Sequence, residues 1–105
     1  MTTLKRNFEF KRAYSRGKSS ITGYFVLYVV KTKKRENNVG YTVSKKVGNA
    51  VIRNRTRRRL KEAFRSISLE ACCFDIVIVA RTRALNVDYA TLQATLEREL
   101  RKLVQ

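Results

Sequence analysis

The chain has 105 residues, 44% of them hydrophobic, and its 24 lysines and arginines outnumber 8 acidic residues to give a net charge of +16. This length allows residues 1–105 to form one domain with a modest core, and the hydrophobic content excludes a disordered basic tail. Like charge on this scale destabilises a compact state and favours a polyanionic partner such as nucleic acid.

Several classes of protein are excluded or disfavoured by simple features of the chain. No stretch approaches the roughly 18 apolar residues of a membrane-spanning helix, and the first residues, MTTLKRNFEF, lack the apolar centre of a secretory signal. With no histidine, Cys/His zinc sites and Cys–His nucleophile pairs are impossible. Cys72 and Cys73 are adjacent, so a disulfide between them is disfavoured and we expect both to be apolar fillers of a cytoplasmic protein.

The first expected element is a short helix over residues 7–17, NFEFKRAYSRG. Asn7 is a suitable N-cap, and Gly17 can close the helix at the C′ position. Spacings of three and four residues place one set of side chains on a single face: Phe10, Ala13 and Tyr14.

An antiparallel pair of strands is expected next. Residues 24–31, YFVLYVVK, are β-branched and aromatic, and residues 39–44, VGYTVS, return after the polar turn KTKKRENN. Alternation along the second strand predicts a set that faces the core: Val39, Tyr41 and Val43. The opposite set is too small and polar to build a core, so its face of the sheet is expected to be open: Gly40, Thr42 and Ser44.

The second half of the chain predicts a helix, a strand and a helix. A basic helix over about residues 49–68 precedes a buried strand, DIVIVA, at residues 75–80, and a last helix follows Asp88 as N-cap. The last helix has one apolar stripe: Tyr89, Leu92, Leu96, Leu100 and Leu103. The order α-β-β-α-β-α predicts an α+β fold, a two-layer sandwich of a small mixed sheet with helices on one face.

The basic helix has two sides when residues 52–67 are projected at about 100° per residue. An apolar stripe contains Ile52, Thr56, Leu60, Ala63, Phe64 and Ile67. The opposite side holds Asn54, Arg55, Arg58, Lys61 and Arg65, with Arg57 and Arg59 flanking it and Arg53 near the apolar edge. Because these charges nearly all have one sign, they cannot form i,i+4 ion pairs, which argues against an ordinary solvated face. The excess of arginine over lysine favours forked contacts with phosphates, and Lys45 and Lys46 precede a helix N-terminus where an anion is also favoured.

A second candidate surface involves aromatic side chains. Phe10 and Tyr14 could meet Val26 and Tyr28 on the open sheet face and form a groove with an aromatic wall. Stacking of unpaired bases on such rings contributes ~1–3 kcal/mol per base. The alternative is that Phe10 and Tyr14 simply anchor the helix to the sheet, and the pattern alone does not separate the two.

Autonomous catalysis by the protein is disfavoured. A protein nuclease needs a cage of carboxylates for metal ions or a pair of histidines. The 8 acidic residues are scattered, and Glu97 and Glu99 point to different sides of a helix. We therefore expect no catalytic residue and no metal ligand in the chain.

Residues 39–65, VGYTVSKKVGNAVIRNRTRRRLKEAFR, resemble the signature of the bacterial ribonuclease P protein family. Its hallmark is an Arg-Asn-Arg helix preceded by Ser-Lys-Lys and Gly-Asn, matched here by Ser44, Lys45, Lys46, Gly48, Asn49, Arg53, Asn54 and Arg55. The resemblance extends to the Phe-bearing first helix, to FVLYVV, to DIVIVAR and to the amphipathic last helix. Tyr14 stands where many relatives carry Phe, which keeps the ring and adds a hydroxyl.

The resemblance implies a ribonucleoprotein endonuclease that removes the 5′ leader of precursor tRNA. The RNA subunit would bind Mg²⁺ and perform the hydrolysis, and the protein would hold no cofactor and need no protein partner or membrane. Docking positions for the catalytic RNA would be Lys46, Asn49, Arg53, Asn54, Arg55, Arg57, Arg58, Arg59, Lys61 and Arg65. The leader would lie in a central cleft lined by Phe10, Tyr14, Val26, Tyr28, Thr42, Ser44 and Lys45.

The resemblance also implies a four-stranded, ribosomal-protein-like α/β sandwich with a left-handed βαβ crossover. Since the pattern predicts only three strands, a fourth is expected around Ser19 to Gly23. Two competing functions stay open. A ribosomal or general RNA-binding module would bind precursor and mature tRNA alike, and a DNA-binding helix is disfavoured because nothing resembling a helix-turn-helix precedes the basic helix.

Overall fold

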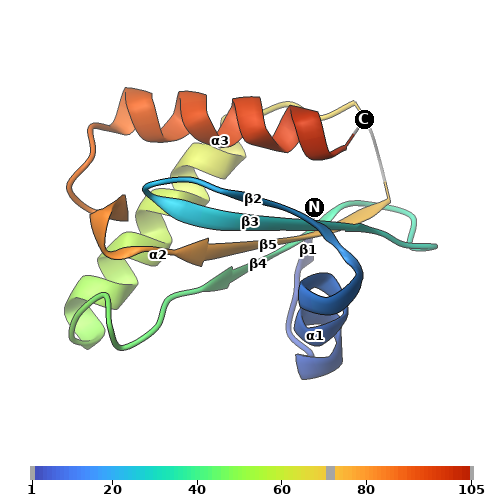
Figure 1. The fold of residues 1–105 in the computed structure, drawn as a ribbon, viewed down its shortest axis with the longest axis horizontal. Coiled ribbons are helices and arrows are strands. Elements are labelled where there is room, and N and C mark those ends of the chain that lie inside the picture. Colours follow the sequence, from blue (N-terminus) through green and yellow to red (C-terminus); the bar gives the residue numbers. More distant parts are fainter. Residues whose placement is uncertain (1, 71–72, 105) are drawn as a thin grey trace.

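A mixed β-sheet with helices on both of its faces forms the protein (Figure 1). The computed structural model describes residues 2–70 and 73–104. The strands are β1 (Thr2–Thr3), β2 (Lys18–Ile21), β3 (Phe25–Lys31), β4 (Asn38–Thr42) and β5 (Phe74–Ala80). The helices are α1 (Asn7–Arg16), α2 (Ala50–Arg65) and α3 (Tyr89–Leu103), with a short 3₁₀ helix, η1 (Thr82–Ala84), after β5.

The strand order is β1-β4-β5-β3-β2. β4 is parallel to β1 and β5, whereas β3 is antiparallel to both β2 and β5. The α2 helix therefore connects two neighbouring parallel strands, β4 and β5, which confirms a βαβ crossover, and its left-handed sense stays a prediction. The strands predicted at residues 24–31 and 39–44 are both present but are not paired with each other, because β5 lies between them.

The α+β class is confirmed, and the prediction of only three strands is wrong. β2 lies at Lys18–Ile21, overlapping the region where the resemblance implied a fourth strand. As an edge strand that pairs only with β3, it lacks the apolar alternation of a half-buried strand. β1 has only two residues and is too short to show a period. β4 ends at Thr42, two residues before the predicted end.

The helix ends differ from prediction in three places. The N-cap of α1 is Arg6 instead of Asn7, and the Arg6 amide donates to Glu9 Oε1 at 3.3 Å. Gly17 is the C-cap with an extended backbone (φ −77°, ψ 157°), so it is not a left-handed C′ glycine. α2 ends at Arg65 instead of residue 68, where the Ile67 amide bonds to the Phe64 carbonyl at 3.0 Å, an i→i−3 bond in place of the helical i→i−4 pattern.

Asp88 is confirmed as the N-cap of α3. Its carboxylate accepts hydrogen bonds from the Thr91 amide at 2.9 Å and from the Thr91 hydroxyl at 2.8 Å. These two bonds, the backbone one first, lower the pKa of Asp88. Of the adjacent cysteines, Cys72 lies outside the described residues, and Cys73 is half-buried with its carbonyl accepting from the Thr32 amide at 2.7 Å.

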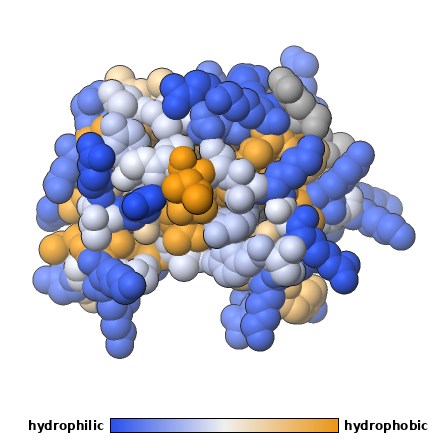
Figure 2. Space-filling model, viewed as in Figure 1, coloured by the Kyte–Doolittle hydropathy of each residue, from blue (hydrophilic) through white to orange (hydrophobic). Residues whose placement is uncertain are grey.

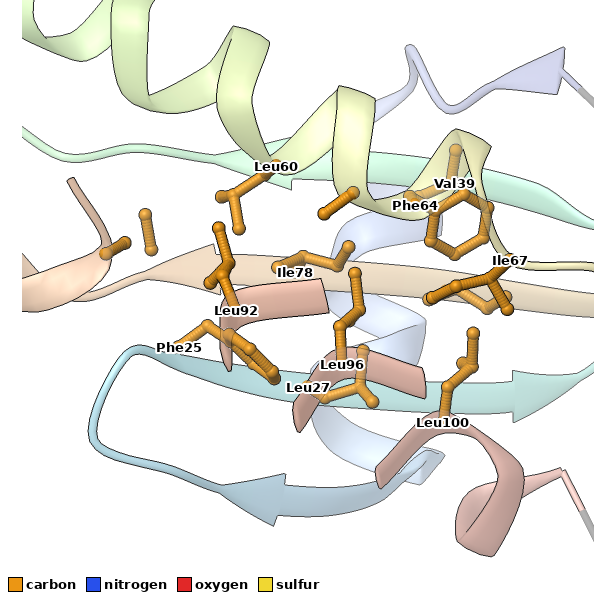
Figure 3. Packing of buried hydrophobic residues seen from close by; sticks show 14 of the residues in the cluster. Phe25, Leu27, Val39, Leu60, Phe64, Ile67, Ile78, Leu92, Leu96 and Leu100 are labelled. Carbon is orange, nitrogen blue, oxygen red and sulfur yellow. The ribbon is translucent and has the colours of Figure 1, made fainter. Parts of the chain in front are cut away.

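The main core lies between the sheet and the helices α2 and α3 (Figure 3). The predicted stripe of α2 is confirmed, with Ile52 half-buried at the edge and Thr56, Leu60, Ala63, Phe64 and Ile67 buried. The predicted stripe of α3 is confirmed at its centre, where Leu92, Leu96 and Leu100 are inaccessible to solvent, but Tyr89 at its start is 43% exposed. Val39 and Val43 are buried in this core and Tyr41 packs against it.

The opposite face of the sheet is covered in part by α1, so the expectation that helices cover only one face is wrong. Ala13 is buried there against Val77, with Phe10 packed beside them. Gly40 allows this close packing, because a Cβ at that position would lie 2.6 Å from Phe10 Cζ. The face of β4 that was expected to be open is therefore closed at Gly40 and open only beyond it.

A buried carboxylate ties α1 to the sheet. Asp75 on β5 is fully buried and accepts hydrogen bonds from Arg12 Nη2 at 2.8 Å and from Lys34 Nζ at 2.9 Å. Lys34 also pairs with Glu9, and that hydrogen bond is the main cause of the lowered pKa of Glu9. Since a buried charge is costly without partners, this network holds α1 and the β3–β4 loop in one arrangement.

Candidate nucleic-acid interface

The outward side of α2 presents cations that the protein does not neutralise. Arg55, Arg58 and Lys61 are exposed and, in residues 2–70 and 73–104, take part in no hydrogen bond or ion pair of their side chains. We call these three side chains the basic face. The buried stripe of α2 holds the helix against the sheet, and hence the basic face points to solvent. In the face of the molecule drawn in Figure 2, hydrophilic side chains project along most of the outline.

The start of α2 is built by two residues of the signature. Asn49 is the N-cap and accepts from the Ile52 amide at 3.0 Å. Gly48 has φ +157°, and a Cβ there would lie 2.7 Å from Ile52 Cγ2, so only glycine fits against the first helical turn. Just before it, Lys45 and Lys46 are exposed in a turn beside the helix N-terminus.

Other candidate docking residues of α2 are engaged within the protein. Arg59 is half-buried and its Nη1 donates to the Ala84 and Leu85 carbonyls at 3.0 and 2.5 Å, which ties α2 to η1. Arg57 donates to Asn54 Oδ1 at 3.0 Å, an exposed bond that RNA could replace.

Arg53 and Arg65 occupy intermediate positions. Arg65 lies 3.7 Å from Glu62, and both side chains are mostly exposed, so this pair contributes little to stability. Arg53 is half-buried, and its Nε is buried without a partner in the described part of the chain. The candidate docking residues of α2 thus fall into two groups: cations that point to solvent, and residues whose side chains bond or pack within the protein. The RNA-binding role of each stays a prediction.

On the other face of the sheet, two tyrosines and a threonine come together. The Tyr14 and Tyr28 rings are edge-to-face, with centroids 5.0 Å apart and an interplanar angle of 74°. Tyr14 Oη and Thr42 Oγ1 share a hydrogen bond of 2.9 Å. The structure therefore joins three predicted cleft residues from α1, β3 and β4.

The strand register shows which part of this face is open. Val79 on β5 lies between Val26 on β3 and Thr42 on β4, and Ile21 on β2 pairs with Val26 on the far side. The neighbouring row, with Val77 at its centre, is the one that α1 covers. The half-buried Tyr28 lies in that covered row, at its border with the open one, and Tyr28 and Val79 both pack against the cluster under α1. We call the group along this border the aromatic strip: Tyr14, Tyr28, Ile21, Val26, Val79 and Thr42.

The two aromatics of α1 differ in position. Phe10 is half-buried over Gly40, so it anchors the helix to the sheet, whereas Tyr14 is 41% exposed at the strip. Ser44 and Lys45 lie exposed past the end of β4. Sequence reasoning missed Ile21, which is 73% exposed, and Val79. Ile21 had a weak signal, since it is an isolated apolar residue in a polar stretch, but Val79 had none, because a continuous apolar run does not reveal its faces.

Several acidic side chains are paired away from the basic face. Glu99 accepts from the Ser20 hydroxyl at 2.6 Å, from Arg98 at 2.9 Å and from Lys102 at 3.3 Å. These bonds, that of Ser20 first, lower the pKa of Glu99 to about 2. In the described residues, no three His, Cys, Asp or Glu side chains gather as metal ligands would, and no helix there has the length and apolarity to cross a membrane.

The fold and these surfaces define a small, strongly basic α+β protein with an outward cationic helix on one face of its sheet and an aromatic strip on the other. The family model described as Ribonuclease P matches residues 1–104. The ribonuclease P protein component of a Thermoanaerobacter species is 41% identical over 100 residues, covering 94% of this chain and 86% of that protein. The one from Caldanaerobacter subterraneus is 40% identical over 103 residues, covering 97% and 89%.

Solved structures agree with the sequence relatives. The RNase P protein of Staphylococcus aureus superposes with a TM-score of 0.83 at 31% identity, covering 100% of this chain and 99% of that one. The RNase P protein of Thermotoga maritima gives a TM-score of 0.81 at 28% identity, covering 97% of each chain. The chain belongs to the ribonuclease P protein family. It is the protein component of a ribonuclease P, and its role lies in tRNA processing.

Proposed function

We propose that the chain docks on the ribonuclease P RNA through the basic face of α2 and holds the 5′ leader of precursor tRNA along the aromatic strip. The observation that carries this proposal is the exposure of Arg55, Arg58 and Lys61 without internal carboxylate partners. The protein brings binding and positioning, while the RNA subunit binds Mg²⁺ and carries out the hydrolysis. No further protein partner is needed, and the complex works in the cytoplasm.

The basic face acts through electrostatics. Each phosphate that a lysine or arginine neutralises releases counterions, so affinity falls steeply with salt and does not depend on base sequence. Guanidinium groups add forked hydrogen bonds to phosphate oxygens that a lysine cannot make. A folded RNA with closely spaced phosphates is the partner that best balances a net charge of +16.

The aromatic strip acts on unpaired nucleotides. A base can stack on an exposed ring whatever its identity, with a contribution of ~1–3 kcal/mol per base. Tyr14 offers such an exposed ring, Tyr28 adds a half-buried ring edge-on to it, and Val26 and Val79 extend the apolar surface beside them. A duplex hides its base faces, so the strip favours the single-stranded leader over the paired acceptor stem.

The turn before α2 connects the two surfaces. The Val47 amide donates to the Ser44 carbonyl at 3.1 Å and closes this turn, which carries the exposed Lys45 and Lys46. A leader leaving the strip past Thr42 meets these cations first. They screen the repulsion between the leader and the catalytic RNA, so the complex needs less magnesium than the RNA alone.

Cleavage of precursor tRNA by the RNA subunit at low magnesium, with and without the purified protein, tests the proposal. We expect strong stimulation by the protein and no cleavage by the protein alone. No stimulation would count against the proposal, and so would protein-only cleavage. A general RNA-binding module would instead show equal affinity of the holoenzyme for precursor and mature tRNA, which a parallel binding measurement would reveal.

A further inference from the structure

A hollow of about 300 Å³ lies between the C-terminal half of α2 and the strands β1 and β4. Its floor is apolar, because Val39, Phe64 and Ile67 all line it. Figure 3 shows these three residues grouped at one end of α2. Ligand pockets span about 300–1,000 Å³, so this hollow belongs to the smallest class and suits a single planar ring system.

The rim of the hollow is cationic. Lys61 and Arg65 line it, and both side chains are exposed on α2. Among the described residues, the solvent-exposed Glu62, 3.7 Å away, is the one ion-pair partner of Arg65. Lys61, in the described chain, has no hydrogen bond or ion pair of its side chain at all. An occupant of this hollow is therefore expected to combine an apolar ring with a negative charge at its edge.

Tyr41 forms one wall and adds a polar group. It is half-buried against the core, and burial, opposed by the charge of Arg65, raises the pKa of Tyr41 to about 12. Its hydroxyl thus stays protonated at neutral pH, and it makes no hydrogen bond to the described residues. The hollow therefore offers one neutral hydroxyl, two cations and an apolar floor.

We propose that this hollow receives one unpaired base of the RNA that docks on α2, with the adjoining phosphate held by Lys61 and Arg65. The inference rests on the proposed function and names a specific contact within that interface. It follows from charge complementarity and from continuity, because Lys61 belongs both to the rim and to the basic face. A flipped base that stacks beside Tyr41 adds a contact with one particular nucleotide, which phosphate contacts alone do not supply.

A variant that fills the hollow without changing charge tests the inference. Thr3 lines the hollow from β1 and is exposed, so Thr3→Trp places an indole in the space of the base. We expect about 10-fold weaker binding to ribonuclease P RNA with an unchanged salt slope, since no phosphate contact is lost. The matched control is Ala94→Trp, at an exposed site on α3, which we expect to bind like the wild type.

Chemical probing of the RNA supplies the second measurement. One unpaired nucleotide should be protected on its base edge by the wild-type protein and by Ala94→Trp, and become reactive with Thr3→Trp. Tyr41→Phe removes only the hydroxyl and should weaken binding about 3-fold, so it keeps the test valid if Thr3→Trp fails to fold. Wild-type affinity and footprint for Thr3→Trp, as judged on folded protein, would overturn the inference while leaving α2 docking intact. Failure of the wild type to bind the RNA would instead refute the proposed function itself.

Discussion

The basic face and the aromatic strip lie on opposite sides of one sheet and differ in almost every property. The basic face has three exposed cations and no ring, whereas the strip has two tyrosines and three aliphatic side chains. Charge on a helix attracts phosphates from a distance and does so for any sequence. Rings act only in contact and only on unpaired bases. In the proposed function, this contrast means that one surface assembles the complex and the other selects the form of the substrate.

The two surfaces also differ in how the fold supports them. The basic face needs only that α2 remain packed on the main core through its buried stripe. The strip depends on α1, which brings Tyr14 to Thr42 and which the Asp75 network holds against the sheet. Damage to that network should therefore impair the strip before it impairs the basic face.

The largest expected effect comes from Asp75→Ala. Arg12 and Lys34 would lose their shared carboxylate, and because Asp75 is fully buried we expect a loss of about 3 kcal/mol in the free energy of unfolding. Urea denaturation measures this loss. At a temperature where the variant stays folded, affinity for leader-bearing substrate should fall while affinity for the RNA subunit is kept. An equal fall in affinity for the leader-bearing substrate and for the RNA subunit would mean that the Asp75 network stabilises α2 as well as α1.

Tyr28→Ala is expected to have the next largest effect and to act on the strip alone. Removal of the ring should cost ~1–3 kcal/mol of binding to a precursor with a leader, because one base loses its stacking partner. Holoenzyme binding to mature tRNA is the internal control and should not change. Should the variant bind the RNA subunit more weakly than the wild type, the separation of the two surfaces would be refuted.

Two neighbouring arginines of α2 make a matched pair. Arg58→Ala removes an outward cation, so affinity for the RNA subunit should fall and the slope of log K against log salt should flatten by about one. Arg59→Ala removes the bonds to the Ala84 and Leu85 carbonyls and should cost about 1–2 kcal/mol of stability instead. Salt titrations and thermal unfolding of both variants separate these outcomes. Identical salt slopes for both variants would show that Arg59 also contacts phosphate.

The smallest expected effect is that of Tyr14→Phe. The variant loses the hydrogen bond to Thr42 but keeps the ring beside Tyr28, so we expect a loss of about 0.5–1 kcal/mol in stability. Leader affinity should stay within about 3-fold of the wild type, since stacking needs the ring and not the hydroxyl. A large loss of leader affinity would assign the hydroxyl a direct contact with the nucleotide.

Short-range sequence patterns predict much of the fold and of the candidate interface. The two sides of α2, the N-cap Asp88 and the apolar strand β5 all follow from residues close together in the chain, and all are present. The polar edge strand β2 escaped pattern analysis, because its stability comes from pairing with β3 and not from its own side chains. The family resemblance predicts a strand in this region, around Ser19 to Gly23.

For the candidate site, composition and the helical period were enough to indicate a helix with an outward cationic side. The sequence alone thus indicates a polyanionic partner and names α2 as its expected docking element, and that docking stays a prediction. Only the tertiary structure decided that Arg59 is tied to η1, that Phe10 is an anchor while Tyr14 is exposed, and that Val79 and Ile21 share a row with Val26. The physical reason is range: a helical or strand period is written in neighbouring residues, whereas these contacts depend on sheet register and on the packing of distant segments.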